Sequence, residues 1–387
     1  MSEKMKTGLE EYFIIKDNKK MRYGYTTGSC AAGAAGAAAR MLLGGKPLSY
    51  ARLMTPRGIE LTLTLLDVSL SEEEVSCAIR KDGGDDPDAT TGLLVYASVK
   101  KCREPGIHID GGRGVGRVTQ KGLEQPVGAA AINKVPRQMI EQEVEKACDE
   151  FSYEGGIQVI ISIPGGEEVA KKTFNPRLGI EGGLSVLGTS GIVVPMSEDA
   201  LIASIRTEMK MRHENGAEYL LVTPGNYGRD FLKNKEDIRS EESMKCSNYV
   251  GETLDSAVNL GIKGILFVAH IGKFIKVSGG IMNTHSRCAD SRAELMCAHA
   301  IRAGAGLDTA RRLLNTITTE EAVDILAEEG LLEKTMEQVI EKVHYYLQHR
   351  CGGALATEAI LFSNNQGWLG QTEGAQEMLQ RFLREKQ

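Results

Sequence analysis

The chain has 387 residues, a formal net charge of −6, a sequence pI near 5.8 and 42% apolar residues. These values describe a globular chain long enough for two or three domains of ~150 residues, and its acidic balance argues against a general polyanion binder. Aromatic residues make up only 5% of the chain, which disfavours a single-strand platform built on stacked rings. We therefore expect no nucleic-acid partner.

Glycine is the unusual part of the composition. The chain contains 44 glycines in 387 residues, about 11% where ~7% is typical. They are clustered and not periodic, so collagen-like and low-complexity chains are excluded. The clusters predict loops in which the backbone comes close to another group.

The cysteines and the first residues indicate a reduced, cytoplasmic protein. Eight cysteines are too sparse for a disulfide scaffold. Residues 1–20 contain no apolar run of the kind found in a secretory signal, and the alanine-rich run at residues 30–43 is too short to span a bilayer. We therefore expect no membrane partner.

The first element of the chain is predicted to be an alanine-rich helix at residues 29–43. Ser29 or Thr27 would cap its start, and the following glycine pair would end it. Its small residues would let another element approach closely. Residues 1–178 as a whole are predicted to form an α+β domain.

Alternating apolar residues predict strands at 59–66 and 74–80. Further along, residues 157–163 and 167–171 flank a Pro-Gly-Gly turn, a pattern that predicts a hairpin.

The pattern changes after residue 178. Strands alternate with helices, which predicts a domain at residues 179–387 with a doubly wound, Rossmann-like and mostly parallel sheet and a helical tail. Ligands of such a sheet bind beyond the carboxyl ends of its strands. The predicted elements are a helix at 197–213, a strand at 218–223, a helix at 247–260, a strand at 264–270, helices between 290 and 348, and a late strand at 359–362.

Two segments of the first domain carry polar groups suited to a ligand. Thr26, Thr27 and Ser29 stand at a helix start, where hydroxyls and free amides can bind an anion or simply cap the helix. The acidic loop, residues 85–88, contains Asp85 and Asp86 and can bind a cation, supply a base or form a solvated turn.

The sequence GGRGVGR from Gly111 resembles two phosphate-binding loops but matches neither. A P-loop needs Gly-Lys-Ser/Thr, and a dinucleotide loop needs a glycine where Arg117 stands. Residues 111–140 nevertheless hold an excess of basic side chains, which suits either an anionic small molecule or a solvated edge. These side chains are Arg113, Arg117, Lys121, Lys134 and Arg137.

The turn after the strand at 218–223 is the best cofactor-site candidate from physical reasoning. Gly225, Asn226, Tyr227 and Gly228 form a strand-to-helix turn where backbone can approach a nucleotide-like ligand. His270 ends the next predicted strand and is either a functional histidine or a buried, hydrogen-bonded one.

Four further residues, His285, Cys288, Cys297 and His299, could suggest a zinc site. Their spacing matches none of the tight structural zinc patterns, and Cys297 and His299 point in different directions on a helix. We expect core residues here and no protein-bound metal.

Several rare strings occur together in this chain. They resemble the cobalt-precorrin-5B C1-methyltransferase family of anaerobic cobalamin biosynthesis, over roughly residues 20–300. The strings, in chain order, are GYTTGSCAAGAA, GGDDPDATTG, GVGRVTQKGL, AINKVPRQMI, KKTFNPRLGIEGGLSVLGTSGIVVPMS, TPGNYGRDF, CSNYVGETLDSAVNLGIKGILFVAHIGK and GIMNTHSRCAD.

The resemblance implies an enzyme that transfers a methyl group from S-adenosylmethionine to C1 of a ring-contracted cobalt corrinoid, giving cobalt-precorrin-6A. The partners would be these small molecules, and the cobalt would belong to the substrate. A homo-oligomer is left open. The chain departs from the family at Thr91, where a histidine is frequent, and at Val194, where a glutamate is frequent.

These interpretations give each candidate residue a role. We expect the adenosyl donor over the C-terminal sheet, near Gly188, Thr189 and Gly191 and the turn at residues 225–228, with the corrinoid between the domains. The expected proton-transfer residues are Asp86 and His270. The expected corrinoid-binding residues are Thr26, Thr27, Ser29, Asp85, Arg113, Arg117, Lys134 and Arg137.

Two other functions remain open from the sequence. A non-catalytic corrinoid carrier could use the same anion-binding loops. A nucleotide-dependent kinase or ligase is the second alternative, and the failed P-loop match argues against it.

Overall fold

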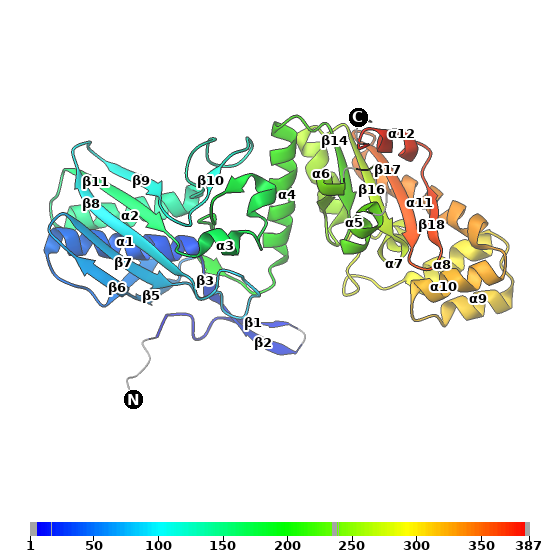
Figure 1. Cartoon of the computed structure of the whole chain (residues 1–387). Helices are drawn as coiled ribbons and strands as arrows, with labels where there is room; N and C mark the ends of the chain where they lie inside the picture. The colour runs from blue at the N-terminus through cyan, green and yellow to red at the C-terminus, as the bar shows by residue number, and fades with distance from the viewer. Residues whose placement is uncertain (1–5, 17, 234–237, 239, 384–387) are drawn as a thin grey trace. The chain divides into compact units, whose positions relative to one another are not determined.

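The computed structural model describes residues 6–16, 18–233, 238 and 240–383. The chain is a mixed α/β protein that divides into two compact units, Met1–Glu198 and Asp199–Gln387 (Figure 1). The sequence placed the division after residue 178. In the structure, residues 179–198 belong to the first unit and not to the C-terminal one.

The first unit contains the elements from β1 to β13. Its strands are β1 (Phe13–Lys16), β2 (Lys19–Arg22), β3 (Gly24–Tyr25), β4 (Tyr50–Met54), β5 (Glu60–Thr64), β6 (Leu66–Leu70), β7 (Glu74–Arg80), β8 (Leu94–Cys102), β9 (Ile107–Gly111), β10 (Arg117–Val118), β11 (Gly156–Ser162), β12 (Ile180–Glu181) and β13 (Ile192–Val193). Its helices are α1 (Thr27–Gly44), α2 (Lys134–Glu150), α3 (Gly166–Ala170) and the 3₁₀ turn Asn175–Leu178.

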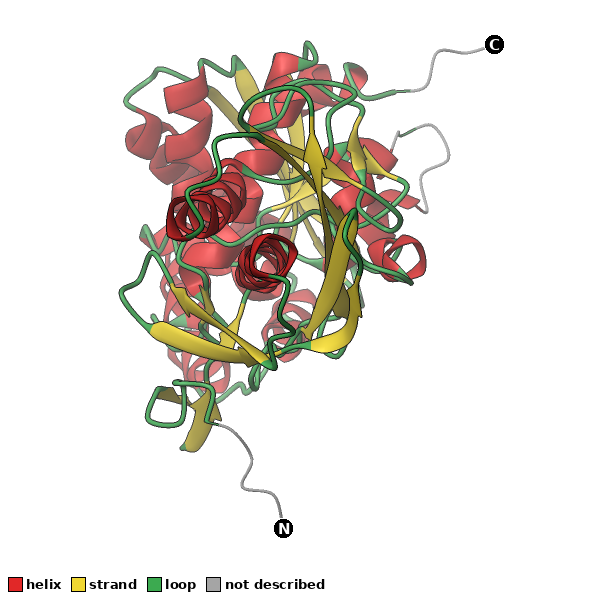
Figure 2. Cartoon of the chain, turned by 90° about the vertical axis from the view of Figure 1, so that its left-hand side faces the viewer, coloured by secondary structure: helices red, strands yellow, loops and turns green. Residues whose placement is uncertain are grey.

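A five-stranded sheet with the order β6-β7-β8-β11-β9 forms the centre of this unit. All neighbours are antiparallel except β11 and β9. Alternate residues of β7, β8 and β11 are buried in one apolar cluster with α1. Figure 2 shows this unit with its two long helices, α1 and α2, close to end-on beside the strands.

The hairpin predicted for residues 157–163 and 167–171 is wrong. The first segment is β11, which pairs with β8 and β9 and not with its sequence neighbour. Gly165 has a φ of +82°, which ends the extended chain, and the next residues form α3 with Glu167 and Glu168 in its first turn. Acidic residues at that position favour a helix start.

The alanine-rich helix is confirmed as α1, and it buries 15 of its 18 residues. Its cap is Thr26, one residue before the predicted Thr27, because the Thr26 hydroxyl accepts the amide of Ser29 at 3.1 Å. Gly45 ends the helix with a φ of +67°. Small residues let α2 approach: a Cβ added at Gly36 would lie 2.8 Å from Glu143 Cβ.

The second unit contains the elements from α4 to α12. Its strands are β14 (Tyr219–Thr223), β15 (Met244–Lys245), β16 (Gly264–His270), β17 (Ala356–Ser363) and β18 (Gly367–Gln371). Its helices are α4 (Glu198–Glu214), α5 (Asn226–Lys233), α6 (Val250–Leu260), α7 (Ile271–Phe274), α8 (Arg292–Arg302), α9 (Leu307–Leu314), α10 (Thr319–Glu328), α11 (Leu332–Cys351) and α12 (Ala375–Gln380), with 3₁₀ turns at Ser240–Glu242 and Ile275–Gly279.

These strands form one sheet with the order β15-β14-β16-β17-β18. The first four are parallel, and β18 is an antiparallel edge strand. Consecutive residues of β14, β16 and β17 alternate between two apolar clusters, one shared with α6, α8 and α11 and one with α5 and α12. Burial on both faces explains why these strands read as continuous apolar runs.

One histidine of this core, His299 on α8, is buried with only 2% of its surface exposed. Its Nε2 lies 2.9 Å from the Ser278 hydroxyl, and its Nδ1 has no hydrogen-bond partner among the described residues. Burial, aided by the charges of Arg302 and Lys342, lowers the pKa of His299 to about 4. The ring is therefore neutral in the folded protein at pH 7.

Replacing Gly36 by valine should destabilise the first unit by about 1–3 kcal/mol, because the added side chain forces α2 away from α1. The midpoint of urea unfolding measures the effect. Gln142→Val on the exposed side of α2 is the matched control, with an expected change of about 0.5 kcal/mol or less. Equal midpoints for the two variants would contradict this account of the helix contact.

The buried His299 should make stability depend on pH. Its folded pKa is below the unfolded value near 6.5, so the unfolded chain binds more protons between these values, and stability falls as pH drops from about 6.5 towards 4. The contribution is at most about 3 kcal/mol. Unfolding measured at pH 7 and pH 5 should show a smaller pH difference for His299→Gln than for the unmodified protein. The exposed His349→Gln should leave the difference unchanged.

Candidate functional site

The carboxyl edge of the second unit's sheet has the topology of a ligand site. From β14 the chain passes to β15 on one side, then crosses to β16 on the other side. The strand order therefore reverses between β14 and β16. In open α/β sheets, ligands bind in the crevice outside the strand ends at such a reversal. Residues 224–228 follow β14 there, and residues 271–273 follow β16 (Figure 1).

Gly225, in the loop after β14, and Gly228, in the first turn of α5, have different surroundings. A Cβ added at Gly228 would lie 2.5 Å from the Val268 carbonyl oxygen, so glycine is needed for α5 to pack against β16. A Cβ added at Gly225 would meet only Lys273 Nζ, at 3.9 Å. The backbone is therefore open at Gly225, where a ligand can approach it.

Two lysine side chains donate hydrogen bonds next to this loop, Lys245 from β15 and Lys273 from α7, which follows β16. Lys273 Nζ donates to Asn248 Oδ1 at 2.8 Å and to the Pro224 carbonyl oxygen at 3.4 Å. Lys245 Nζ donates to Asn226 Oδ1. Lys245, Asn248 and Lys273 were absent from the sequence-based candidates, because only the strand order brings them to one loop.

An exposed aromatic ring lies next to this edge. Tyr227 is 62% exposed, and its ring centroid lies 5.3 Å from that of His270. Phe362 of β17 contacts His270 from another direction, edge-on at 5.5 Å. The arrangement offers an apolar ring face to a planar ligand.

Both ring nitrogens of His270 have partners in the protein. Nδ1 accepts the Gly272 amide at 3.0 Å, so the proton of the neutral ring is assigned to Nε2, which donates to Glu320 Oε1 at 2.7 Å. Glu320 also accepts the amides of Asn364 and Asn365, at 2.9 and 3.2 Å. Glu320 thus joins the ends of β16 and β17, and the sequence pattern did not identify it.

In the first unit, the acidic loop is held by protein donors. Asp85 Oδ2 accepts the Arg22 amide at 2.6 Å, and Asp86 Oδ1 accepts the Met196 amide at 2.7 Å. Asp88 forms an ion pair with Lys81 at 2.9 Å. Burial opposes ionisation of Asp88, but the Lys81 ammonium and Thr90 outweigh it and lower the pKa of the carboxyl group.

The three candidate hydroxyls at the start of α1 are buried and bonded within the protein. Thr26 caps the helix, Thr27 exchanges hydrogen bonds with the backbone of Leu187, and Ser29 donates to the Gly191 carbonyl oxygen at 2.7 Å. Thr26 thus acts as the helix cap, whereas Thr27 and Ser29 hold the backbone of Leu187 and Gly191 against the helix start.

The same contacts correct the expected position of Gly188, Thr189 and Gly191. The Thr26 amide donates to the Gly191 carbonyl oxygen at 3.1 Å, and β13 pairs with β3. All three residues belong to the first unit, and Gly188 and Gly191 pack against the start of α1, so they are not part of the C-terminal sheet as expected.

The four basic residues expected to bind the corrinoid differ in how accessible they are. Arg117 forms a bidentate pair with Asp110, at 2.7 and 3.1 Å. Arg137 donates to two backbone carbonyl groups, and burial lowers its pKa. Arg113 is 77% exposed, 3.7 Å from Glu167, and Lys134 is exposed at the start of α2. Arg113 and Lys134 are the more accessible cations of the four.

Close backbone packing inside the first unit explains several of its glycines. A Cβ added at Gly114 would lie 1.9 Å from the Ile163 carbonyl oxygen, and one added at Gly24 would lie 2.2 Å from the Gly83 carbonyl carbon. At these two positions the close neighbour is the protein's own backbone, so the expectation of ligand approach is corrected there.

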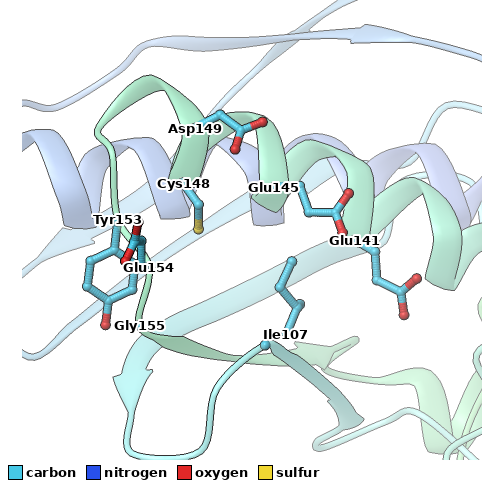
Figure 3. Close-up of a pocket in the computed structure, with 9 residues that line it drawn as sticks. Ile107, Glu141, Glu145, Cys148, Asp149, Tyr153, Glu154 and Gly155 are labelled. Atoms are coloured by element: carbon cyan, nitrogen blue, oxygen red, sulfur yellow. The ribbon is translucent and has the colours of Figure 1, made fainter.

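Two cavities outside the sheet edge are lined by acidic residues. One, of about 280 Å³, lies beside α2, where Figure 3 shows Glu141, Glu145 and Asp149 along the helix. The other, of about 1070 Å³, lies between α11 and β18 and includes Glu337 and Glu341. Carboxylate linings of this kind repel anionic ligands.

The sequence-based zinc candidates are not a cluster. Cys297 and His299 are buried in the core of the second unit, while His285 and Cys288 are exposed. Over residues 6–16, 18–233, 238 and 240–383, no group of three or more His, Cys, Asp or Glu side chains is arranged to hold a metal ion. Within the same residues, every helix is too short or too polar to cross a membrane.

Comparisons with known proteins agree with the resemblance noted in the sequence. The CbiD family profile matches residues 14–195, and the profile of the CbiD C-terminal domain matches residues 283–373. A solved structure, the cobalamin biosynthesis protein CbiD from Archaeoglobus fulgidus, is 26% identical, with a TM-score of 0.39, and the match covers 72% of this chain and 87% of that one.

Curated relatives are similar over nearly their whole lengths. The protein from Ruminiclostridium cellulolyticum, named cobalt-precorrin-5B C(1)-methyltransferase, is 46% identical over 97% of this chain and 99% of its own. Those from Alkaliphilus metalliredigens and Thermoanaerobacter sp., which bear the same name, are 44% and 46% identical over 96% and 92% of this chain and 97% of each relative. The chain belongs to the CbiD family.

Proposed function

We propose that this protein transfers a methyl group from S-adenosylmethionine to C1 of cobalt-precorrin-5B, giving cobalt-precorrin-6A. The observation that carries the proposal is the 44–46% identity to proteins named for this reaction, over 92–97% of the chain. The reaction makes the protein a C-methyltransferase of cobalamin biosynthesis.

The methyl donor binds, in this proposal, at the carboxyl edge of the Rossmann-like sheet in the second unit. The open backbone at Gly225 and the exposed ring of Tyr227 support this position. Asn226 and Gly228 lie in the first turn of α5, and Gly228 acts through the packing of α5 on β16.

The corrinoid needs cations for its acetate and propionate groups. Among the four candidate cations, Arg113 and Lys134 are exposed and are the proposed donors, whereas Arg117 and Arg137 already bind protein oxygens. Thr26, Thr27, Ser29 and Asp85 are likewise engaged within the protein, so their contact with substrate stays a prediction. The cobalt arrives as part of the substrate.

The main task of the protein in this reaction is to position the methyl donor and the corrinoid. Methyl transfer from a sulfonium is an in-line displacement in which the electron-rich corrinoid carbon is the nucleophile, so no side-chain nucleophile is required. The protein holds donor and acceptor in near-attack geometry and excludes water. Asp86 and His270 are the proposed residues for any accompanying proton movement.

Incubation with methyl-labelled S-adenosylmethionine and cobalt-precorrin-5B tests the proposed function. We expect label in the corrinoid. Bound but unmodified corrinoid would support the carrier instead, and indifference to S-adenosylmethionine together with ATP turnover would support a kinase or ligase.

Gly225→Val tests the position of the donor. The loop has room for the side chain, so the fold should be kept, while the affinity for S-adenosylhomocysteine measured by calorimetry should fall at least about tenfold. Gly306→Val is the control, because Gly306 also has no close neighbour and lies at the start of α9. Unchanged affinity in Gly225→Val would place the donor elsewhere.

Asp86→Asn and His270→Gln test proton transfer separately. Loss of an acid or base should lower the rate about 10²–10⁴-fold and change its pH profile. Methyl transfer is measured across pH in single-turnover reactions. A variant that keeps the full rate at every pH eliminates that residue as acid or base.

A further inference from the structure

Lys273 is the cation nearest to the open backbone of the proposed donor site. It lies on α7, directly after the end of β16, and the residue is exposed to solvent. Its ammonium group donates to Asn248 Oδ1 and to the Pro224 carbonyl oxygen. An ammonium group has three N–H donors, so these two bonds leave one donor for a ligand.

The positive charge of Lys273 is not neutralised by the described part of the chain. Both of its hydrogen-bond acceptors are uncharged, and no carboxylate of the described residues lies within ion-pair distance. The nearby thiol of Cys246 is neutral at pH 7, since burial raises its pKa to about 12. The buried Lys81 differs, because it pairs with Asp88 at 2.9 Å.

The surroundings of Lys273 also favour the arrival of an anion. Burial lowers the pKa of Lys273, which means that the charged form lacks part of the solvation it has in water. A bound carboxylate would restore that stabilisation through a charge-assisted hydrogen bond. Within the described residues, the site therefore has an unused donor and an uncompensated charge, and the backbone is open at Gly225, 3.9 Å from the ammonium group when measured from an added Cβ.

We infer that Lys273 binds a carboxylate group of the ligand that occupies the crevice between the ends of β14 and β16. The inference rests on the proposed function, and it assigns a residue that fixes the ligand's orientation. Two molecules of the reaction carry a carboxylate: the amino-acid end of the methyl donor, and the acetate and propionate arms of the corrinoid.

Calorimetry with two donor-like compounds separates these sources. S-adenosylhomocysteine carries the amino-acid carboxylate, and 5′-methylthioadenosine lacks the whole amino-acid group. If Lys273 binds the donor, Lys273→Met should weaken S-adenosylhomocysteine binding at least tenfold and change 5′-methylthioadenosine binding less than twofold. Lys273→Arg, which keeps the charge, should recover most of the affinity.

The corrinoid arm uses the methyl-transfer reaction. If the carboxylate belongs to the corrinoid, Lys273→Met should leave S-adenosylhomocysteine affinity unchanged and raise the KM for cobalt-precorrin-5B at least tenfold, which also supports the inference. The exposed Lys210→Met on α4 is the control for loss of a surface charge and should match the unmodified protein. Thermal unfolding of each variant checks that the fold is kept.

Failure of the inference can be distinguished from failure of the proposed function. If the unmodified protein transfers the labelled methyl group and Lys273→Met matches it in both affinity and KM, the inference is overturned and the function stands. If the unmodified protein neither binds S-adenosylhomocysteine nor transfers label, the proposed function fails, and the role of Lys273 fails with it.

Discussion

The two-sided burial of β14, β16 and β17 is the constraint on which the second unit depends. Their consecutive side chains alternate between two apolar clusters, so a shift of one residue would exchange the faces of a strand. Because β14, β16 and β17 also run parallel, their carboxyl ends lie at one edge of the sheet. The open backbone of Gly225 and the ammonium group of Lys273 meet at this edge because their strands end there.

Polar contacts then fix the loops at that edge. Glu320 accepts hydrogen bonds from His270 and from the backbone after β17, and Lys273 ties the end of β16 to the loop after β14. Each contact joins segments far apart in the sequence. The charged group is Glu320 or Lys273, and its partner is a backbone group or the His270 ring. These contacts fix the loops on the protein side, while the Lys273 ammonium group keeps one hydrogen-bond donor unused among the described residues.

Local patterns predicted those elements whose periodicity is set by burial. The small-residue helix α1 and the apolar strands β14 and β16 are close to their predicted limits. The hairpin at residues 157–171 failed because β11 takes its partners from β8 and β9, which no local turn signal encodes. Gly188 and Gly191 were assigned to the wrong unit for the same reason: their neighbours are Thr26 and Ser29, which in each pair lie 162 residues earlier in the sequence (188 − 26 and 191 − 29).

The sequence by itself determined the family, through rare strings that recur in order, and it predicted that glycine-rich loops let the backbone come close to another group. Only the tertiary structure decided what approaches. At Gly114 and Gly228 it is another segment of the protein, and at Gly225 the space is open. A glycine in the sequence shows that a position has no side chain. Which neighbour requires this is decided by packing between distant segments, and a local sequence pattern does not contain that information.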